Sequence, residues 1–170
     1  MDEGVQGVAV ALGSNCGDRL GFLREAVRRI DAAGLLLDMR CSHAYETPPE
    51  RPADGGVFLN GAVAGATRLS PRRLLDRLLR IETDMGRRRI TGVHGGPRPI
   101  DLDLVLFGDR IVEEPGLTLP HPRFHLRAFV LVPVAEVMPD ARDPRSGRSL
   151  HSLLGQSPTV TLSRAGSLRK

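Results

Sequence analysis

Four stretches of the chain have the short apolar or alternating pattern of β-strands. They are residues 7–12, residues 35–45, residues 57–67 and the segment that contains Asp101 and Asp103. The first stretch runs into a polar turn at residues 13–18. Pro48, Pro49 and Pro52 prevent the second from continuing, because proline lacks the amide donor of a strand ladder. A loop is therefore predicted over residues 47–56.

Two other stretches follow a helical period. In the first, apolar residues recur every three or four positions, arginines occupy the opposite face, and Gly34 ends the pattern. The apolar residues are Leu20, Leu23, Val27 and Ile30. The second stretch has Ser70 as an N-cap and Pro71 at the first helical position. Its buried stripe consists of Leu74, Leu75, Leu78 and Ile81.

The last third of the chain has weaker patterns. A turn is predicted at residues 108–109 with a short return strand at 110–112. Residues 124–138 are apolar and predict a helix with irregular ends, residues 140–148 a loop, and residues 150–154 one more helical turn. The polar composition of the tail from Ser157, residues 157–170, is typical of a disordered segment.

The order strand, helix, strand, strand, helix, strand is that of the split βαβ, or ferredoxin-like, motif. We therefore predict an α+β fold, a ferredoxin-like antiparallel sheet with packed helices on one face. A chain of 170 residues fits one domain and buries about 70% of its unfolded surface. The whole chain, residues 1–170, is interpreted as a single domain.

Two carboxylates, Asp101 and Asp103, stand two residues apart in an apolar run. In an extended strand they share one face, with roughly 6.5 to 7 Å between their Cα atoms. The opposite face would carry Ile100, Leu102, Leu104 and Leu106. Adjacent carboxylates repel each other unless a cation lies between them or water solvates them. Arg87 and Arg98 stand at the two ends of the preceding loop, so the pattern predicts a metal and phosphate site.

An alternative interpretation is an edge strand whose outer face is simply solvated. The Gly-Gly-Pro-Arg sequence at residues 95–98 favours the site, because such a loop allows close backbone approach to a ligand. Glu82 lies at the edge of the second helix's apolar stripe, which is a poor place for an acid that only packs. It is either a border residue that reaches water or a group aimed into a site at the sheet edge.

The charge is +4, and Lys170 is the sole lysine among 24 lysine and arginine residues. A P-loop needs an internal lysine that contacts the nucleotide phosphates, so the P-loop class of nucleotide-binding proteins is excluded. Many arginines also suit nucleic-acid binding, but one Tyr, five Phe and no Trp leave few rings for base stacking. With no long apolar run and no signal pattern at the N-terminus, a cytoplasmic protein is expected. Cys16 and Cys41 are expected to be reduced thiols.

Four separated segments resemble the 6-hydroxymethyl-7,8-dihydropterin pyrophosphokinase family over about residues 7 to 137. They are L-G-S-N at 12–15 with G-D at 17–18; Y-E-T-P-P at 45–49 followed by F-L-N at 58–60; E-x-x-x-G-R and G-P-R-x-I-D-L-D within 82–103; and L-P-H-P at 119–122 with R-A-F-V-L at 127–131. The G-P-R-x-I-D-L-D run is close to diagnostic, and the order and spacing of all four make a chance similarity implausible.

The resemblance implies transfer of pyrophosphate from ATP to the pterin hydroxymethyl group, with release of AMP. It also implies two magnesium ions as cofactors. It implies that Asp101 and Asp103 bind the metals and, with Arg87 and Arg98, carry the catalysis. The implied ATP-binding residues are Glu82, Arg87, Arg98, Ile100, Thr118, His121 and Arg127. The implied pterin-binding residues are Asn15, Thr47, Pro48, Glu50, Phe58, Asn60, Asp101 and Phe129, with the two phenylalanines stacking on the ring.

The chain departs from the family pattern at three places. Gly95 follows His94 where many members have tryptophan, Pro122 replaces an aromatic residue, and Phe58 replaces a frequent tyrosine. Two loops, residues 48–56 and 88–96, are expected to close over the substrates. We expect a monomer that binds ATP and the pterin but neither nucleic acid nor membrane. The alternatives are an RNA-binding module on a ferredoxin-like sheet and a phosphotransferase acting on another heterocycle.

Overall fold

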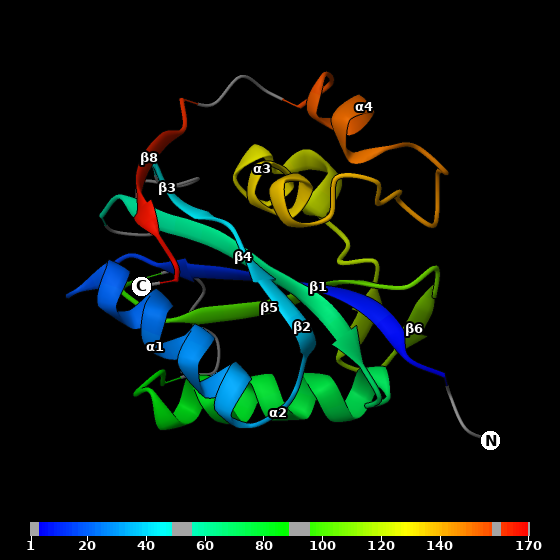
Figure 1. The fold of residues 1–170 in the computed structure, drawn as a ribbon. Coiled ribbons are helices and arrows are strands. Elements are labelled where there is room, and N and C mark those ends of the chain that lie inside the picture. Colours follow the sequence, from blue (N-terminus) through cyan, green and yellow to red (C-terminus); the bar gives the residue numbers. More distant parts are fainter. Residues whose placement is uncertain (1–3, 49–55, 89–95, 158–160, 170) are drawn as a thin grey trace.

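The computed structural model describes residues 4–48, 56–88, 96–157 and 161–169. Its centre is an antiparallel sheet in the order β5-β1-β4-β3-β8, with β2 also paired to β4 (Figure 1). The strands are β1 (Gln6–Ser14), β2 (Leu37–Cys41), β3 (His43–Thr47), β4 (Phe58–Thr67), β5 (Asp101–Phe107) and β8 (Ser163–Ser167). A hairpin of β6 (Val112–Glu114) and β7 (Leu117–Leu119) forms a second, small sheet. The predicted ferredoxin-like α+β fold is confirmed.

The two predicted helices form where the sequence signals place them. Helix α1 (Arg19–Ala32) starts at Asp18, whose Oδ1 accepts a hydrogen bond from the Gly21 N–H at 2.9 Å. Helix α2 (Pro71–Asp84) starts at the Ser70 N-cap, which accepts from the Arg73 N–H. Both caps satisfy amide groups that the first turn of a helix leaves without partners. Helix α1 ends just before Gly34, as predicted.

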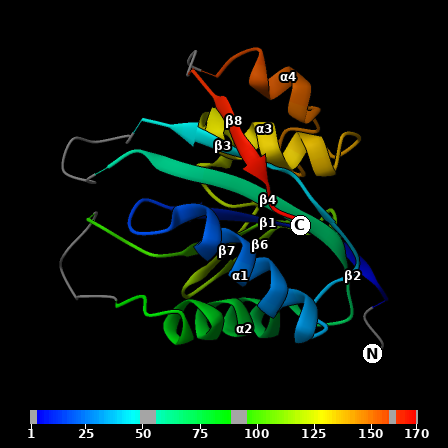
Figure 2. The same cartoon turned by 60° about the vertical axis from the view of Figure 1, so that its left-hand side comes forward.

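Helices cover both faces of the sheet, so the prediction of helices on one face is wrong. Helices α1 and α2 lie on one face, and α3 (Ala128–Val137) and α4 (Leu150–Leu154) lie on the other (Figure 2). A 3-10 turn, η2 (Phe124–Leu126), precedes α3. Helix α3 is apolar on nearly every side, which is typical of a helix enclosed by other elements.

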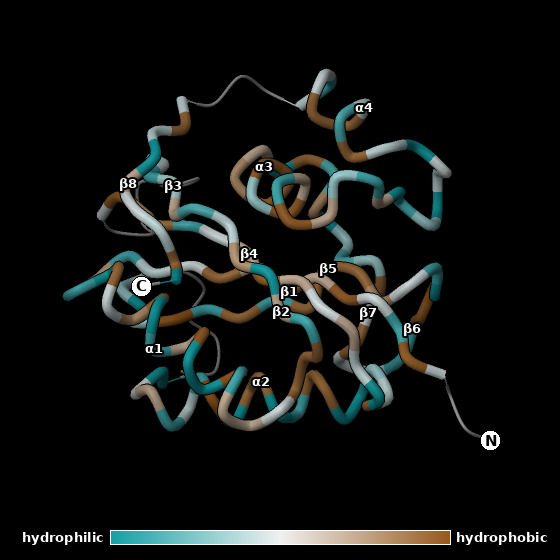
Figure 3. The backbone as a smooth tube through the Cα atoms, in the orientation of Figure 1, coloured by the Kyte–Doolittle hydropathy of each residue, from teal (hydrophilic) through white to brown (hydrophobic). Residues whose placement is uncertain are grey.

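Each face of the sheet has its own core. The first core lies beneath α1 and α2 and takes Val8, Val10 and Leu12 from β1. The second core lies beneath α3 and α4 and takes small residues from the same strands, namely Ala9, Ala11, Ala62 and Ala64. Small side chains leave room for an apolar helix to approach the sheet closely. Figure 3 shows the apolar strands between the two helical layers.

The second predicted strand is two strands. Ser42 interrupts it because its hydroxyl accepts from the Ala62 N–H at 2.9 Å and donates to the His43 carbonyl at 2.7 Å. The side chain thereby takes part in the ladder, and β2 and β3 pair with β4 on either side of this residue. The return strand predicted at 110–112 is displaced to β6, which pairs with β7 instead of the main sheet.

The disorder predicted for the tail is contradicted in its described part. Residues 163–167 form β8, which pairs antiparallel with β3. Leu168, the residue after this strand, is 2% exposed and belongs to the first core. A polar strand with one apolar anchor has little sequence signal of its own, because its stability comes from the strand that it joins.

The face assigned to Leu106 is also wrong. The register between β1 and β5 shifts between Ala9 and Val10, so that Leu104 pairs with Val10 but Leu106 pairs with Ala9. This bulge inserts Val105 and turns the end of β5 over, since a one-residue shift reverses the faces of a strand. Leu106 therefore packs in the second core.

Within the described part of the chain, no helix combines the length and the apolarity that crossing a membrane requires.

The first core should carry much of the stability. Leu78 of α2 is fully buried there, so Leu78→Ala is expected to lower the free energy of unfolding by about 2–5 kcal/mol. Leu37 on β2 is 42% exposed, so Leu37→Ala should change the free energy of unfolding by no more than about 0.5 kcal/mol. Urea unfolding followed by circular dichroism measures both, and equal losses would contradict this assignment of the core.

Candidate functional site

Two aspartates project from the start of β5 on the face that α3 and α4 cover. Asp101 pairs with Gly13 and Asp103 with Ala11 of β1. Between and beyond them, Leu102 and Leu104 are 1% and 4% exposed in the first core. The predicted arrangement of the two carboxylates on one face is confirmed, and their binding of metal stays a prediction.

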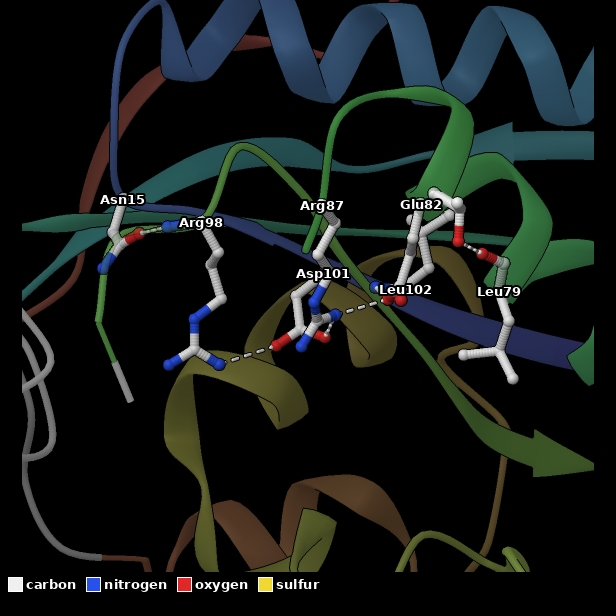
Figure 4. A network of polar contacts seen from close by, with 8 residues as sticks. Asn15, Leu79, Glu82, Arg87, Arg98, Asp101 and Leu102 are labelled. Atoms are coloured by element: carbon white, nitrogen blue, oxygen red, sulfur yellow. Dashed lines mark hydrogen bonds and ion pairs between the residues drawn. The ribbon is translucent and has the colours of Figure 1, made fainter. Parts of the chain in front are cut away.

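Glu82 joins α2 to this strand. Its carboxylate is 1% exposed, and Oε1 accepts from the Leu102 backbone N–H and from Arg87 Nη1, each at 2.6 Å. Arg87 Nη1 also donates to Asp101 Oδ1 (Figure 4). The interpretation of Glu82 as a border residue that reaches water is therefore wrong. Its carboxylate fixes both the strand that bears the aspartates and the arginine that faces them.

A second arginine reaches Asp101 from the segment before β5. Arg98 Nη1 donates to Asp101 Oδ2 at 3.1 Å. The backbone around Arg98 is held by Asn15, whose Oδ1 accepts from the Arg98 N–H at 2.7 Å and whose Nδ2 donates to the Gly96 carbonyl at 3.3 Å. The Asn15 N–H also donates to the Arg98 carbonyl. Asn15 thus positions the arginine-bearing segment at the site (Figure 4).

The carboxylates of Glu82, Asp101 and Asp103 interact electrostatically in a largely buried part of the site. Burial, together with the carboxylates of Asp101 and Glu82, raises the pKa of Asp103 from its usual 3.8 to about 7, against the opposing effect of Arg127 and Arg87. The ionised form of a buried carboxylate with a raised pKa is unfavourable, and a nearby cation stabilises it. The two arginines on Asp101 supply part of that positive charge, and a metal ion would supply the rest.

Gly13 lacks a side chain, and three side chains border the small hollow, about the size of one methyl group, that this leaves. A Cβ atom there would lie 3.2 Å from Asn60 Oδ1, 3.9 Å from the Asp101 Cβ and 4.0 Å from Phe58 Cδ1. Asn60 is buried, and its Nδ2 donates to Thr47 Oγ1 at 2.7 Å. The sheet register therefore brings together four of the predicted pterin-binding residues around one glycine.

The segment before α3 adds basic groups. Burial lowers the pKa of His121, with Arg127 and Arg123 acting in the same direction and Asp101 against them. Its Nδ1 accepts from the Arg123 N–H at 3.3 Å, which fits a neutral ring with the proton on Nε2. The Arg127 guanidinium lies 5.5 Å from the Phe129 ring centre. Arg98 lies at the same distance from the Phe58 ring, so each predicted stacking ring carries an arginine.

Some predicted residues lie elsewhere or outside the described residues. Ile100 is fully buried in the first core, so only its backbone is available to ATP. Thr118 is partly buried on β7, and Pro48 is exposed at the end of β3. Glu50 lies outside the described residues, as does most of each predicted mobile loop.

Two residues of the site act in ways that the sequence did not indicate, although Asn15 was among the predicted pterin-binding residues. One is Gly13, whose role depends on a register with β4 and β5 that the sequence does not display. The other is Asn15, which holds Gly96 and Arg98 across a separation of more than 80 residues. The L-G-S-N motif at 12–15 contains both Gly13 and Asn15. It does not indicate which groups these two residues contact.

The donors at the site suit a hard divalent cation that also binds phosphate. Magnesium is commonly held by one or two carboxylates together with substrate phosphates and water. Asp101 and Asp103 provide such a pair, and the raised pKa of Asp103 marks a place where positive charge is favourable. No cluster of three or more potential metal ligands occurs among the described residues, so a cage built from protein alone is not present there.

The fold and the site define an α+β protein in which a carboxylate pair and two arginines lie beside a glycine of the central sheet. Residues 9–139 match the family model described as 7,8-dihydro-6-hydroxymethylpterin-pyrophosphokinase (HPPK). The chain belongs to this family.

Relatives from several kingdoms support the assignment. The chain is 39% identical over 154 residues to the 2-amino-4-hydroxy-6-hydroxymethyldihydropteridine pyrophosphokinase of Pseudomonas aeruginosa, covering 91% of this chain and 93% of that protein. It is 41% identical over 150 residues to the enzyme of the same name from Synechocystis, covering 88% of this chain and 75% of that protein. The mitochondrial folate synthesis bifunctional protein of Pisum sativum is 43% identical over 88% of this chain.

The fold has solved counterparts. A wild-type HPPK-DHPS crystal structure from Plasmodium falciparum matches with a TM-score of 0.69 at 14% identity over 89% of this chain. This chain covers 44% of that structure and 28% of the pea protein, so it spans only part of these longer relatives.

Loss of the Glu82 carboxylate should be costly. Glu82→Ala leaves the Leu102 N–H without its acceptor and the buried Arg87 charge without one partner, so a loss of about 3–5 kcal/mol in unfolding free energy is expected. The control is Glu113→Ala, since Glu113 pairs with Arg145 at the surface and its side chain is 69% exposed. That change should cost at most about 1 kcal/mol. Similar losses in urea unfolding would argue against the structural role of Glu82.

Asp103 should make stability fall as pH rises. Its folded pKa of about 7 lies above the usual 3.8, so between these values the folded chain binds more protons than the unfolded chain. Without divalent cations, the unfolding free energy of Asp103→Asn relative to that of wild type should increase as pH rises from 5 to 8, because wild type loses stability over this range whereas the uncharged variant does not. One pKa unit corresponds to about 1.4 kcal/mol. A difference that does not change with pH would contradict the raised pKa.

Proposed function

We propose that this chain transfers pyrophosphate from ATP to the hydroxymethyl group of 6-hydroxymethyl-7,8-dihydropterin and releases AMP, a step of folate biosynthesis. The observation that carries the proposal is the contact of Arg87 and Arg98 with Asp101, one of the two carboxylates, beside the hollow over Gly13. One part of the site suits a metal-bound polyphosphate and the other a flat heterocycle with polar edges. The family to which the chain belongs supports this pair of substrates.

The pterin side consists of the residues around Gly13. Asn60 has an amide that can both donate to and accept from the ring edge, while its bond to Thr47 fixes its orientation. Phe58 and Phe129 stack on the two faces of the ring, and backbone groups near Pro48 complete the edge. Asp101 borders the same hollow, which brings the hydroxymethyl group next to the phosphate-binding residues.

The nucleotide side consists of the arginines with Glu82 and His121, and Ile100 and Thr118 are proposed as further ATP contacts. Guanidinium groups suit phosphate because their fixed donors match its oxygens. Arg87 and Arg98 now donate to Asp101, and phosphates would compete for these donors. Asp101 and Asp103 would hold magnesium, of which two ions are expected, and the metal would offset charge on the phosphates. Arg87 and Arg98 have further N–H donors that can bind the nucleotide phosphates.

The reaction needs positioning and charge neutralisation more than covalent help. The pterin hydroxyl oxygen attacks the β-phosphorus, the bond from that phosphorus to the oxygen shared with the α-phosphate breaks, and AMP leaves with that oxygen. Arg87, Arg98 and Arg127 stabilise negative charge on the transferred group and on AMP. Neutral His121 can donate a hydrogen bond to a phosphate oxygen from Nε2. The hydroxyl proton passes to solvent or to a nearby carboxylate.

A direct assay tests the proposal. The purified chain is incubated with magnesium, ATP and the pterin, and the adenine nucleotides are separated by chromatography. Pterin-dependent AMP without ADP is the expected result. ADP would favour a phosphotransferase acting on another heterocycle, and intact ATP with salt-sensitive RNA binding would favour the RNA-binding module.

The carboxylate pair should be required for turnover. Asp101→Asn and Asp103→Asn are each expected to lower kcat/KM for AMP formation by at least roughly 100-fold, because each removes a charge that holds the metal and phosphates. Asp109→Asn is the control, since Asp109 is an exposed aspartate just beyond β5. Circular dichroism verifies that the variants fold. Wild-type turnover in either site variant would refute the metal assignment.

A further inference from the structure

The C-terminal strand β8 lies next to the strand that leads into the pterin side of the site. It pairs antiparallel with β3 in a register that joins His43 to Ser167 and Glu46 to Ser163. Strand β3 ends at Thr47, the partner of Asn60. Figures 1 and 2 both show β8 alongside β3, with the C-terminus close to α1. The match to the HPPK family model ends at residue 139 of this chain, so β8 lies outside the matched region.

Leu168 fixes the end of this strand in the first core. It is 2% exposed and lies over Gly61, where a Cβ atom would come within 2.7 Å of Leu168 Cδ1. Gly61 therefore provides the space that the leucine occupies. Because Gly61 directly follows Asn60 in β4, the anchor contacts the sheet from the face opposite to the hollow.

Two further contacts hold β8 against α1. Arg24 Nε donates to the Ser167 carbonyl at 3.0 Å. Gly166 lies against Leu20, where a Cβ atom would come within 3.2 Å of Leu20 Cδ2. Helix α1 lies on the first-core face of the sheet. Strand β8 is therefore held against the helical layer opposite to the face that carries the site.

Strand β3 is also tied to the opposite layer. The Tyr45 hydroxyl donates to Glu136 Oε2 of α3 at 2.7 Å, and the His43 N–H donates to the same carboxylate at 3.2 Å. Helix α3 begins beside Arg127 and carries Phe129 in its first turn. Strand β3 is thus held by β4 on one edge, by β8 on the other and by α3 across the face of the site.

We propose that the C-terminal strand, anchored by Leu168, positions β3 and Thr47 for pterin binding, with Leu168 as a positioning residue. The inference rests on the proposed function. Without β8, β3 becomes an edge strand held by the short ladder to β4 and by Glu136. Thr47 and the Asn60 amide that it orients then lose their fixed placement. The ATP side, built on β5, α2 and Asn15, makes none of these contacts and keeps its geometry.

The test compares Leu168→Asp with Ala165→Asp. Both place the same charge in the C-terminal segment, but Ala165 is exposed on β8 whereas Leu168 is buried. Leu168→Asp is expected to raise the KM for the pterin about tenfold or more, while the KM for ATP and kcat change less than about twofold. Ala165→Asp should match wild type, and the conservative Leu168→Met should restore most of the pterin affinity.

Hydrogen exchange of the full-length variants supplies a readout that is independent of activity. Faster exchange at β3 and β8 with a raised pterin KM supports the inference. Faster exchange there with an unchanged pterin KM overturns it, as does an equal rise in the KM values of both substrates. If Leu168→Asp does not fold, the milder Leu168→Ala is tested by the same measurements and judged by the same outcomes.

The two proposals can fail separately. Wild-type protein that forms no pterin-dependent AMP refutes the proposed function. Wild-type protein that forms AMP, with Leu168→Asp and Leu168→Ala matching it in exchange and in pterin KM, refutes only the role of the C-terminal strand.

Discussion

Repulsion between carboxylates is the interaction around which this structure is organised. Asp101, Asp103 and Glu82 lie close enough that burial and mutual repulsion hold the pKa of Asp103 near 7. The positive charges of Arg87 and Arg98, which both donate hydrogen bonds to Asp101, oppose this repulsion. These groups come from three segments, so helix α2 with the residues after it, the segment before β5 and β5 itself must all be in place before the charges balance. The same balance makes the site receptive to a metal-bound polyphosphate.

The different side-chain sizes on the two faces of the sheet explain where that site lies. Valine and leucine from β1 and β5 pack beneath α1 and α2, whereas alanines admit the apolar helix α3 on the other face. Continuing along that alanine face, β1 reaches Gly13, where the missing side chain leaves the hollow bounded by Asn60, Asp101 and Phe58. The hollow is thus the end of the surface that lets α3 approach closely.

Local signals predicted most of the elements but not their assembly. Ser70 and Pro71 located the start of α2, and Gly34 the end of α1, because caps act within one helical turn. The break at Ser42 was missed because it depends on a hydrogen bond to Ala62, twenty residues away. The strand β8 was missed because its partner is β3, more than a hundred residues earlier. The buried position of Glu82 likewise depends on the Leu102 amide of another element.

The sequence by itself determined the periods of the helices and strands, the pairing of Asp101 and Asp103 on one face, and the family motifs, since each is written within a few neighbouring residues. Only the tertiary structure decided that helices cover both faces, that Asn15 holds Arg98 and that Leu168 anchors the tail over Gly61. The reason is physical. Alternation fixes which side of a strand a residue occupies, but the contact it makes there depends on register and packing between segments far apart in the chain.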